Sequence, residues 1–181
     1  RQICYLANLL KENNNDVTIL TYHGDNFFIK ELQKNNIKHI KLQDKNKLLR
    51  IFKLIKFLRN SQHDIVIAYL RNPSFIAEIA GFFDVKWKLI VSERNNYIND
   101  NYFKNLIRRF FHLFSDHVIV NSNTNFKAII KNAPWLKKVS LIYNFTDLDY
   151  FKPKYDLSNE NKEKITLIGV GKYSYQKNII N

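Results

Sequence analysis

Two lysines near the end of the sequence follow an apolar run, residues 165–171, that predicts a buried strand. Lys172 and Lys177 lie five residues apart, and Gly171 ends the strand. Exposed backbone amides and two ammonium groups suit a diphosphate, because together they offset two or more negative charges. The glycine spacing fits neither the phosphate-loop nor the dinucleotide-binding pattern. On spacing alone, a diphosphate site and a solvated lysine pair are therefore equal alternatives.

Polar side chains also follow two other predicted strands, residues 64–70 and 87–92. Ligands of open parallel sheets bind outside the carboxyl ends of the strands, so these side chains could orient a hydroxyl or phosphate group of a ligand. For the adjacent charges Glu93 and Arg94, the alternative is a surface ion pair that contributes little to stability. The candidates are Arg71, Glu93, Arg94 and Asn95. Asn72 is instead expected to cap a helix that starts at Pro73.

Predicted strands and helices alternate along the chain, and the candidates lie where predicted strands end. Apolar runs predict strands at residues 16–21, 37–42, 64–70, 87–92, 117–121 and 139–143. Helical periodicity predicts helices at residues 1–10, 26–35, 45–60, 73–81, 102–114 and 123–132. The run at 64–70 has no polar alternation, which predicts a strand buried on both faces of a parallel sheet. The alternation predicts an α/β fold with a Rossmann-like, doubly wound parallel sheet.

A polar, charged stretch separates this domain from the last strand. We predict a first domain at residues 1–152, a linker at 153–164, and the first strand and phosphate-binding loop of a second domain at 165–181. The opening helix has no strand before it, so we expect the first strand to lie upstream and the second domain to continue downstream. The chain is therefore expected to be truncated at both ends.

The composition limits the partners and the chemistry. A net charge of +13 and a pI of about 9.7 favour nucleic acids, anionic lipids or phosphorylated small molecules. One cysteine, Cys4, excludes an intramolecular disulfide and a cysteine zinc site. The five histidines lack metal-ligand spacing, so no metal is predicted. No apolar run approaches the roughly 20 residues of a membrane-spanning helix.

Four segments resemble motifs of the retaining glycosyltransferases of family 4. Residues 142–153 (IYNFTDLDYFKP) resemble I-x-N-G-[VI]-D-x-x-x-F-x-P, and residues 170–178 (VGKYSYQKN) resemble V-G-R-L-x-x-x-K-[GN]. Residues 115–122 (SDHVIVNS) resemble the A-D-x-V-I-x-x-S strand, and residues 92–95 (SERN) resemble a variant found in some members. The first two of these segments occur in the order and at the separation that the family shows.

This resemblance implies a GT-B architecture, in which two Rossmann-like domains hold the acceptor and the nucleotide-sugar. Lys172 takes the place of the family's arginine and Lys177 matches its lysine, so both would contact the donor diphosphate. Asn144 lies in the first motif and is a further candidate for the ligand site, although Phe145 and Thr146 replace the usual glycine and valine. The residues that grip the donor sugar would lie beyond Asn181.

The expected function is transfer of a sugar from a nucleotide-diphosphate donor, expected to be a UDP-sugar, to a lipid-linked or saccharide acceptor. The setting would be bacterial-type glycan or polysaccharide biosynthesis, with retention of configuration and without a metal or other cofactor. The catalytic residues are unassigned, and the fragment is expected to be inactive alone. The alternatives are a basic nucleic-acid-binding module and a sugar-nucleotide epimerase on the same fold. No nucleic-acid-binding motif is present, so nucleic acid is not an expected partner.

The helix at 45–60 predicts contact with an anionic membrane surface. Its apolar face is formed by Leu48, Ile51, Phe52, Leu54, Ile55 and Leu58. The opposite face carries Arg50, Lys53 and Lys56, with Leu49 and Phe57 among them. A basic face with exposed apolar side chains is typical of a membrane-surface helix, which predicts a cytoplasmic protein peripheral to the inner face of the cell membrane.

The helix at 102–114 has a similar polarity. Contact with a membrane surface is the alternative for this helix too, but the favoured interpretation is that its apolar side chains pack against the sheet and its polar side chains face solvent. The apolar set is Phe103, Ile107, Phe110 and Phe114. The polar set is Lys104, Arg108, Arg109 and His112.

Overall fold

The computed structural model describes residues 1–23, 27–82, 84–94, 102–146, 148 and 151. Arg1–Phe145 forms one compact unit, and Thr146–Asn181 forms a second. Four of the predicted site residues, Asn95, Gly171, Lys172 and Lys177, lie outside the described residues. So do the predicted linker and the strand at 165–171, and the predicted domain boundaries stay predictions.

Helices and strands alternate through the first unit, as the sequence predicts. The elements are α1 (Gln2–Glu12), β1 (Thr18–Thr21), α2 (Ile29–Lys34), β2 (Lys38–Lys41), α3 (Lys47–Arg59), β3 (Ile65–Tyr69), α4 (Arg71–Gly81), β4 (Lys88–Glu93), α5 (Tyr102–Phe111), the 3-10 turn η1 (His112–Phe114), β5 (His117–Val120), α6 (Asn123–Asn132) and β6 (Val139–Leu141). Side-chain caps fix two of the helix starts. Asn46 accepts bonds from the N–H groups of Leu48 and Leu49, and Ser122 accepts one from Asn125.

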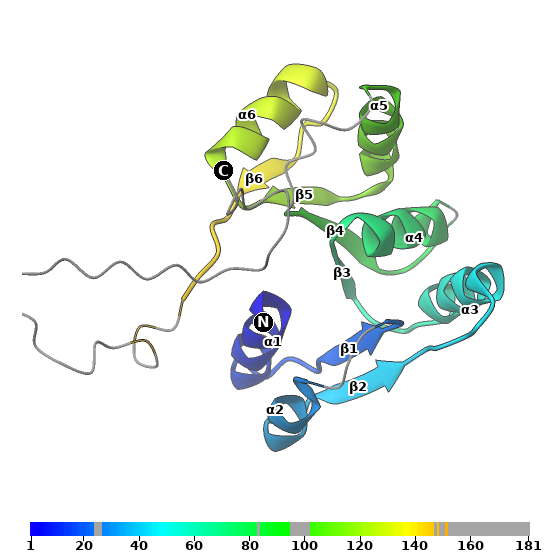
Figure 1. Cartoon of the computed structure of the whole chain (residues 1–181), viewed down its shortest axis with the longest axis vertical. Coiled ribbons are helices and arrows are strands. Elements are labelled where there is room, and N and C mark those ends of the chain that lie inside the picture. The colour runs from blue at the N-terminus through cyan, green and yellow to red at the C-terminus, as the bar shows by residue number, and fades with distance from the viewer. Residues whose placement is uncertain (24–26, 83, 95–101, 147, 149–150, 152–181) are drawn as a thin grey trace, which may run out of the picture. The chain divides into compact units, whose positions relative to one another are not determined.

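The strands form two parallel sheets among the described residues. β1 pairs with β2, and a second sheet has the order β3-β4-β5-β6. Figure 1 shows α3, α4 and α5 on one side of the strands and α1 on the other. Parallel strands joined through helices on both sides are what a doubly wound α/β fold requires, so the predicted fold class is confirmed.

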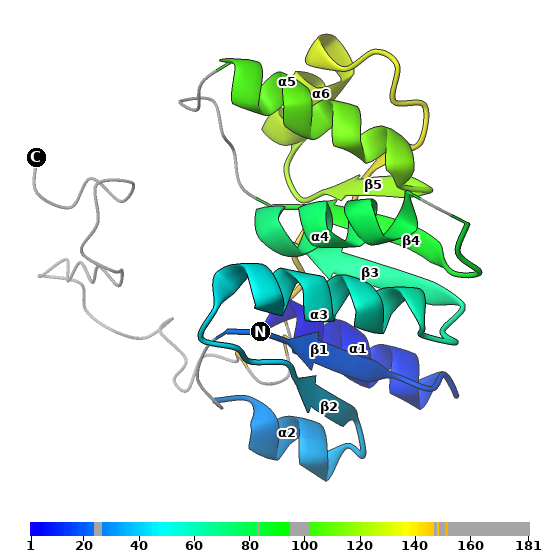
Figure 2. The ribbon, with the colours of Figure 1, turned by 90° about the vertical axis from the view of Figure 1, so that its right-hand side faces the viewer.

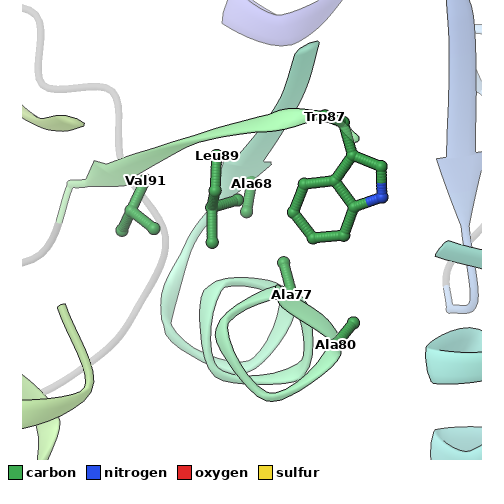
Figure 3. Close-up of a cluster of buried hydrophobic side chains, with 6 residues drawn as sticks. All are labelled: Ala68, Ala77, Ala80, Trp87, Leu89 and Val91. Carbon is green, nitrogen blue, oxygen red and sulfur yellow. The ribbon is translucent and has the colours of Figure 1, made fainter. Parts of the chain in front are cut away.

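The best-buried core lies between α4 and strands β3 and β4 (Figure 3). Its members are Ala68, Ala77, Ala80, Trp87, Leu89 and Val91. Small residues on α4 let the helix lie close to the sheet, and the Trp87 ring fills the space beside Ala80. The Trp87 Nε1–H donates to the backbone oxygen of Leu58 at 2.9 Å, which fastens α3 to the start of β4.

The sheet register places α4 and α6 on the same face of the four-stranded sheet. Ala68, Val91 and Val118 are lateral partners across β3, β4 and β5, and side chains at paired positions point to one face. Ala68 and Val91 pack with Ala77 of α4, whereas Val118 packs with Ile129 of α6. A separate cluster joins α1 and α2 to β1.

Two expectations for β3 and α4 are wrong. The sequence predicts that β3 is buried on both faces, yet Ile65 is exposed and only Ala68 is buried. The reason is that β3 has one hydrogen-bonded neighbour, β4, within the described part of the chain. Asn72 does not cap α4, because the helix starts two residues earlier than predicted, at Arg71, and its N-cap is Leu70, which makes no side-chain cap bond.

The orientation of α5 is also the reverse of the expected one for five of the named residues, whereas Lys104 is exposed as predicted. Arg108 and His112 are buried, although the sequence predicts that they face solvent. Phe103, Ile107 and Phe110 are exposed by 69%, 54% and 54%, although the sequence predicts that they pack on the sheet. The physical reason is a set of buried carboxylates that pair with the polar side, as described below.

On α3, the packed stripe is narrower than predicted. Leu54 is buried, and Ile55 and Leu58 pack against the core. Leu48 and Phe52, which were assigned to the same stripe, are 77% and 66% exposed. Among the helices that the structure describes, none is long and apolar enough to cross a membrane.

Candidate functional site

The carboxyl ends of β3, β4, β5 and β6 meet at one edge of the sheet. Tyr69 pairs with Ser92, and Glu93 pairs with Val120, which in turn pairs with Leu141. The residues that follow these strands therefore emerge at the same edge, where parallel α/β sheets bind ligands. They include the sequence candidates Arg71, Arg94 and Asn144.

Arg94 is the best-defined cation at this edge. Its guanidinium lies over the Tyr69 ring, with Cζ 4.8 Å from the ring centroid, and its Nε–H donates to Ser92 Oγ at 3.2 Å. These contacts hold the side chain half-buried against the ends of two adjacent strands. Burial raises the pKa of the Tyr69 hydroxyl, and the Arg94 charge opposes that rise. A planar cation fixed in this way is suited to a phosphate or carboxylate ligand.

The backbone between β3 and α4 is strained at the same edge. Leu70 has φ 73° and ψ 168°, a conformation that side-chain-bearing residues rarely adopt and that costs about 1–3 kcal/mol. Its N–H donates to the backbone oxygen of Ser92 at 3.2 Å. Arg71, the first residue of α4, follows this turn, so it begins at the same edge of the sheet where Arg94 follows β4.

Asn144 is exposed and follows β6. The next residue, Phe145, is tied to the start of α1 by two bonds with the side chain of Gln2. The Gln2 Nε2–H donates to the Phe145 backbone oxygen at 2.7 Å, and the Phe145 N–H donates to Gln2 Oε1 at 3.2 Å. Tyr5 adds an edge-to-face ring contact with Phe145 at 4.9 Å. The loop that carries Asn144 is therefore held beside the N-terminus of α1.

Glu93 does not face the sheet edge as a free carboxylate. It is 8% exposed, and Arg108 Nη2 lies 2.9 Å from its Oε1. His112 Nε2 lies 3.1 Å from its Oε2, and the other ring nitrogen, Nδ1, lies 2.5 Å from Glu78 Oε1. We call Glu78, Glu93, Arg108 and His112 the buried charge cluster. It joins α4, the end of β4, α5 and η1.

The cluster is neutral when His112 is protonated, because two carboxylates then face two cations. Burial alone would lower the pKa of His112, but hydrogen bonds and charge from Glu78 and Glu93 raise it overall. Both ring nitrogens face carboxylate oxygens, and only the imidazolium can donate from both. Burial alone would raise the pKa of Glu93, but His112 and Arg108 lower it overall.

The cluster is not among the sites predicted from the sequence. The histidines lack metal-ligand spacing, so no site is predicted at His112, and none is predicted at Glu78. A usable signal was present, since Glu78 is an acidic residue inside the otherwise apolar α4 sequence FIAEIAG. A carboxylate on the core-facing side of a helix needs a cationic partner. The partner itself could not be identified, because His112 is 34 residues away.

Two of the α3 residues predicted to contact a membrane make contacts within the protein. Lys53 pairs with Asp44 at 2.8 Å, and the Arg50 guanidinium lies over the Tyr22 ring at 5.7 Å. Lys56 and Leu49 are exposed, whereas Phe57 is half-buried. These positions neither require nor oppose contact with a membrane. Within the described residues, no group of three metal-ligating side chains is present.

The parallel order of the strands, with polar residues at their carboxyl ends, defines an α/β protein of the ligand-binding Rossmann-like class. The chain belongs to Glycosyltransferase Family 4, whose family model matches residues 1–150. A search of curated proteins found no match. The matched range includes α1 to β6 and the candidates Arg71, Glu93, Arg94, Asn95 and Asn144, which places them in a glycosyltransferase domain.

Proposed function

We propose that this domain binds the acceptor of a retaining GT-B glycosyltransferase. The enzyme would transfer a sugar from a nucleotide-diphosphate donor, without a metal, to a lipid-linked or saccharide acceptor in glycan biosynthesis. The observation that supports this proposal best is the position of Arg94, which is fixed over Tyr69 at the carboxyl edge of the sheet. The sheet lies within the residues that match the glycosyltransferase family. An arginine held in this way would orient an acceptor phosphate or hydroxyl. The family match favours this proposal over a nucleic-acid-binding module.

The donor would be bound mainly by a second domain, through Gly171, Lys172 and Lys177. Two ammonium groups beside backbone amides would stabilise the diphosphate as negative charge develops on it during bond cleavage. Lys172 would supply charge without the bidentate geometry of an arginine, so the diphosphate would be held by a point charge. The sequence supports this part through the motif resemblance at residues 170–178.

Calorimetric titration of the full protein with a UDP-sugar tests the donor site. We expect Lys177→Ala to weaken binding by roughly tenfold or more, because a hydrogen bond to a charged group contributes about 1.5–3 kcal/mol. Lys127→Ala is the matched control, since Lys127 is an exposed lysine on α6. Equal affinities for the wild type and Lys177→Ala would contradict the donor assignment.

We further propose that the enzyme works at the cytoplasmic face of the membrane and that α3 contributes to its binding there. Support comes from the exposed side chains of Lys53, Lys56 and Leu49, together with the net charge of +13. The double variant Lys53→Glu with Lys56→Glu should weaken binding to anionic vesicles. If binding is unchanged, α3 is an ordinary solvated helix.

A further inference from the structure

The helix α5 turns its polar side inward and its apolar side outward. Arg108 and His112, one helical turn apart, are buried in the charge cluster. Phe103, Ile107 and Phe110 recur at the spacing of one helix face and are all exposed. An amphipathic helix at the surface of a globular protein normally packs its apolar face on the core and exposes its polar face to water. The exposed apolar face of α5 therefore needs an explanation outside the described fold.

Aromatic residues of α4 extend this face. Phe75 lies 4.5 Å from Phe111, and Phe82 lies 4.8 Å from Phe114, measured between ring centroids. The exposed members define what we call the aromatic patch: Phe75, Phe82, Phe103, Ile107, Phe110 and Leu113. Figure 2 shows α4 and α5 as neighbours on one side of the molecule, with α3 beside α4. Large contiguous apolar patches on a protein surface mark sites of interaction.

The buried charge cluster fixes this orientation. If α5 rotated to bury its phenylalanines, Arg108 would leave Glu93, and His112 would leave Glu78. Separating a buried carboxylate from its cation is costly, because the remaining charge has no water around it. The patch is therefore held at the surface by the fold itself.

We propose that the aromatic patch binds the surface of an anionic lipid bilayer. Cations flank the apolar stripe of α5 on both sides of the helix, with Lys104 exposed and Arg109 half-buried. Phenyl rings would enter the boundary between headgroups and acyl chains, while the flanking cations would meet lipid phosphates. The net charge of +13 favours a polyanionic surface over a neutral one.

Two other occupants are less compatible with these charges. A second copy would bring the flanking cations of two chains together, and each chain carries a net charge of +13. Single-stranded nucleic acid binds where aromatic rings alternate with cations along a groove. Here Phe103, Ile107 and Phe110 form a continuous apolar stripe, and the cations lie beside it. The proposal depends neither on the transferase assignment nor on α3.

Co-sedimentation of the full chain with vesicles tests the proposal. We expect binding to vesicles of equimolar phosphatidylglycerol and phosphatidylcholine, and much weaker binding to phosphatidylcholine alone. Phe103→Ser with Phe110→Ser should lower the partition coefficient by about tenfold or more, because two rings can no longer leave water. The matched control, Phe27→Ser with Ile130→Ser, removes two exposed apolar side chains elsewhere and should bind as the wild type does.

Charge reversal tests the contribution of the cations that flank the apolar stripe. Lys104→Glu should weaken vesicle binding more than Lys127→Glu, which makes the same change in net charge on α6. Binding by Phe103→Ser with Phe110→Ser that equals the wild type would overturn the proposal. So would a dimer that this variant converts to a monomer while vesicle binding is kept, because the patch would then join two copies.

A conservative variant guards against effects on folding. Phe110→Trp should show stronger fluorescence quenching by brominated acyl chains than the wild type, in which Trp87 is buried and Trp135 lies outside the patch. Quenching that equals the wild type would overturn the proposal. Loss of binding in Leu48→Ser with Phe52→Ser, together with wild-type binding in Phe103→Ser with Phe110→Ser, would assign the bilayer contact to α3 and would also overturn the proposal.

Discussion

His112 Nδ1 lies 2.5 Å from Glu78 Oε1, with both side chains fully buried, and this pair joins η1 to the middle of α4. Together with Glu93 and Arg108 it forms a neutral cluster beneath the carboxyl end of β4 when the imidazole is protonated. The cluster determines which side of α5 faces outward and supports the end of β4, which Arg94 follows. Stability, pH response and the surface of the protein are therefore linked through these side chains.

Replacing His112 should strongly destabilise the fold. His112→Ala leaves Glu78 buried without this partner, and breaking a buried ion pair costs about 3–5 kcal/mol. Urea unfolding monitored by far-UV circular dichroism measures the loss. His117→Ala is the control, because His117 is half-buried and bonds to Ser140 Oγ, so about 1 kcal/mol is expected. Equal losses in the two variants would argue against a cluster of paired charges.

Stability should depend on pH through His112. Its folded-state pKa is raised above the ordinary value of 6.5, so its contribution is complete below pH 6.5 and is lost as the pH rises through the folded pKa. The free energy of unfolding should fall above pH 6.5 by at most about 1.4 kcal/mol per pH unit. Urea titrations between pH 6 and 9 measure this slope. His112→Gln should lack it, and a flat wild-type profile would contradict the protonated cluster.

Stability should also depend on pH through Glu93, but here it should fall as the pH falls. Its folded-state pKa is lowered from the ordinary 4.5, so its contribution is complete above pH 4.5 and is lost as the pH falls through the folded pKa. Urea titrations between pH 2 and 5 should show falling stability, with a smaller slope in Glu93→Gln. A variant with the wild-type slope would assign acid unfolding to other carboxylates.

Arg94 should be important for the acceptor if the proposed transferase function is right. Arg94→Ala should lower kcat/KM for the acceptor by roughly tenfold to a hundredfold, and Arg94→Lys should recover part of this loss by restoring charge without the planar stack. Steady-state kinetics at varied acceptor concentration measures both. Lys131→Ala, an exposed change on α6, is the control. If Arg94→Ala matches the control, Arg94 has only a structural role.

Gly81 should not tolerate a side chain. A Cβ there would lie 3.1 and 3.2 Å from two carbons of the Trp87 ring, which is buried and held by its bond to Leu58. Gly81→Ala should therefore cost about 1–3 kcal/mol, despite the better helix propensity of alanine. Unfolding of both single variants and the double variant with Trp87→Phe measures the coupling, since the smaller ring gives space. If the losses in the two single variants add up to the loss in the double variant, the Cβ and the Trp87 ring are not in steric conflict.

The sequence by itself determined the succession of elements. The helix at 123–132 was predicted with the bounds that α6 has, and strands were predicted at all six positions. The reason is that hydrophobic periodicity and capping residues act locally, over one or two turns. The candidates at the sheet edge followed equally, because the strands are parallel and their carboxyl ends must coincide.

The tertiary structure decided which faces are buried. The periodicity of α5 shows two faces but not which one points inward, and that choice depends on carboxylates 34 and 19 residues from His112 along the chain. Such partners are set by packing between elements, which no local pattern encodes. The same limit explains Asn72, which does not cap α4 because the strained turn at Leu70 starts the helix two residues earlier than predicted.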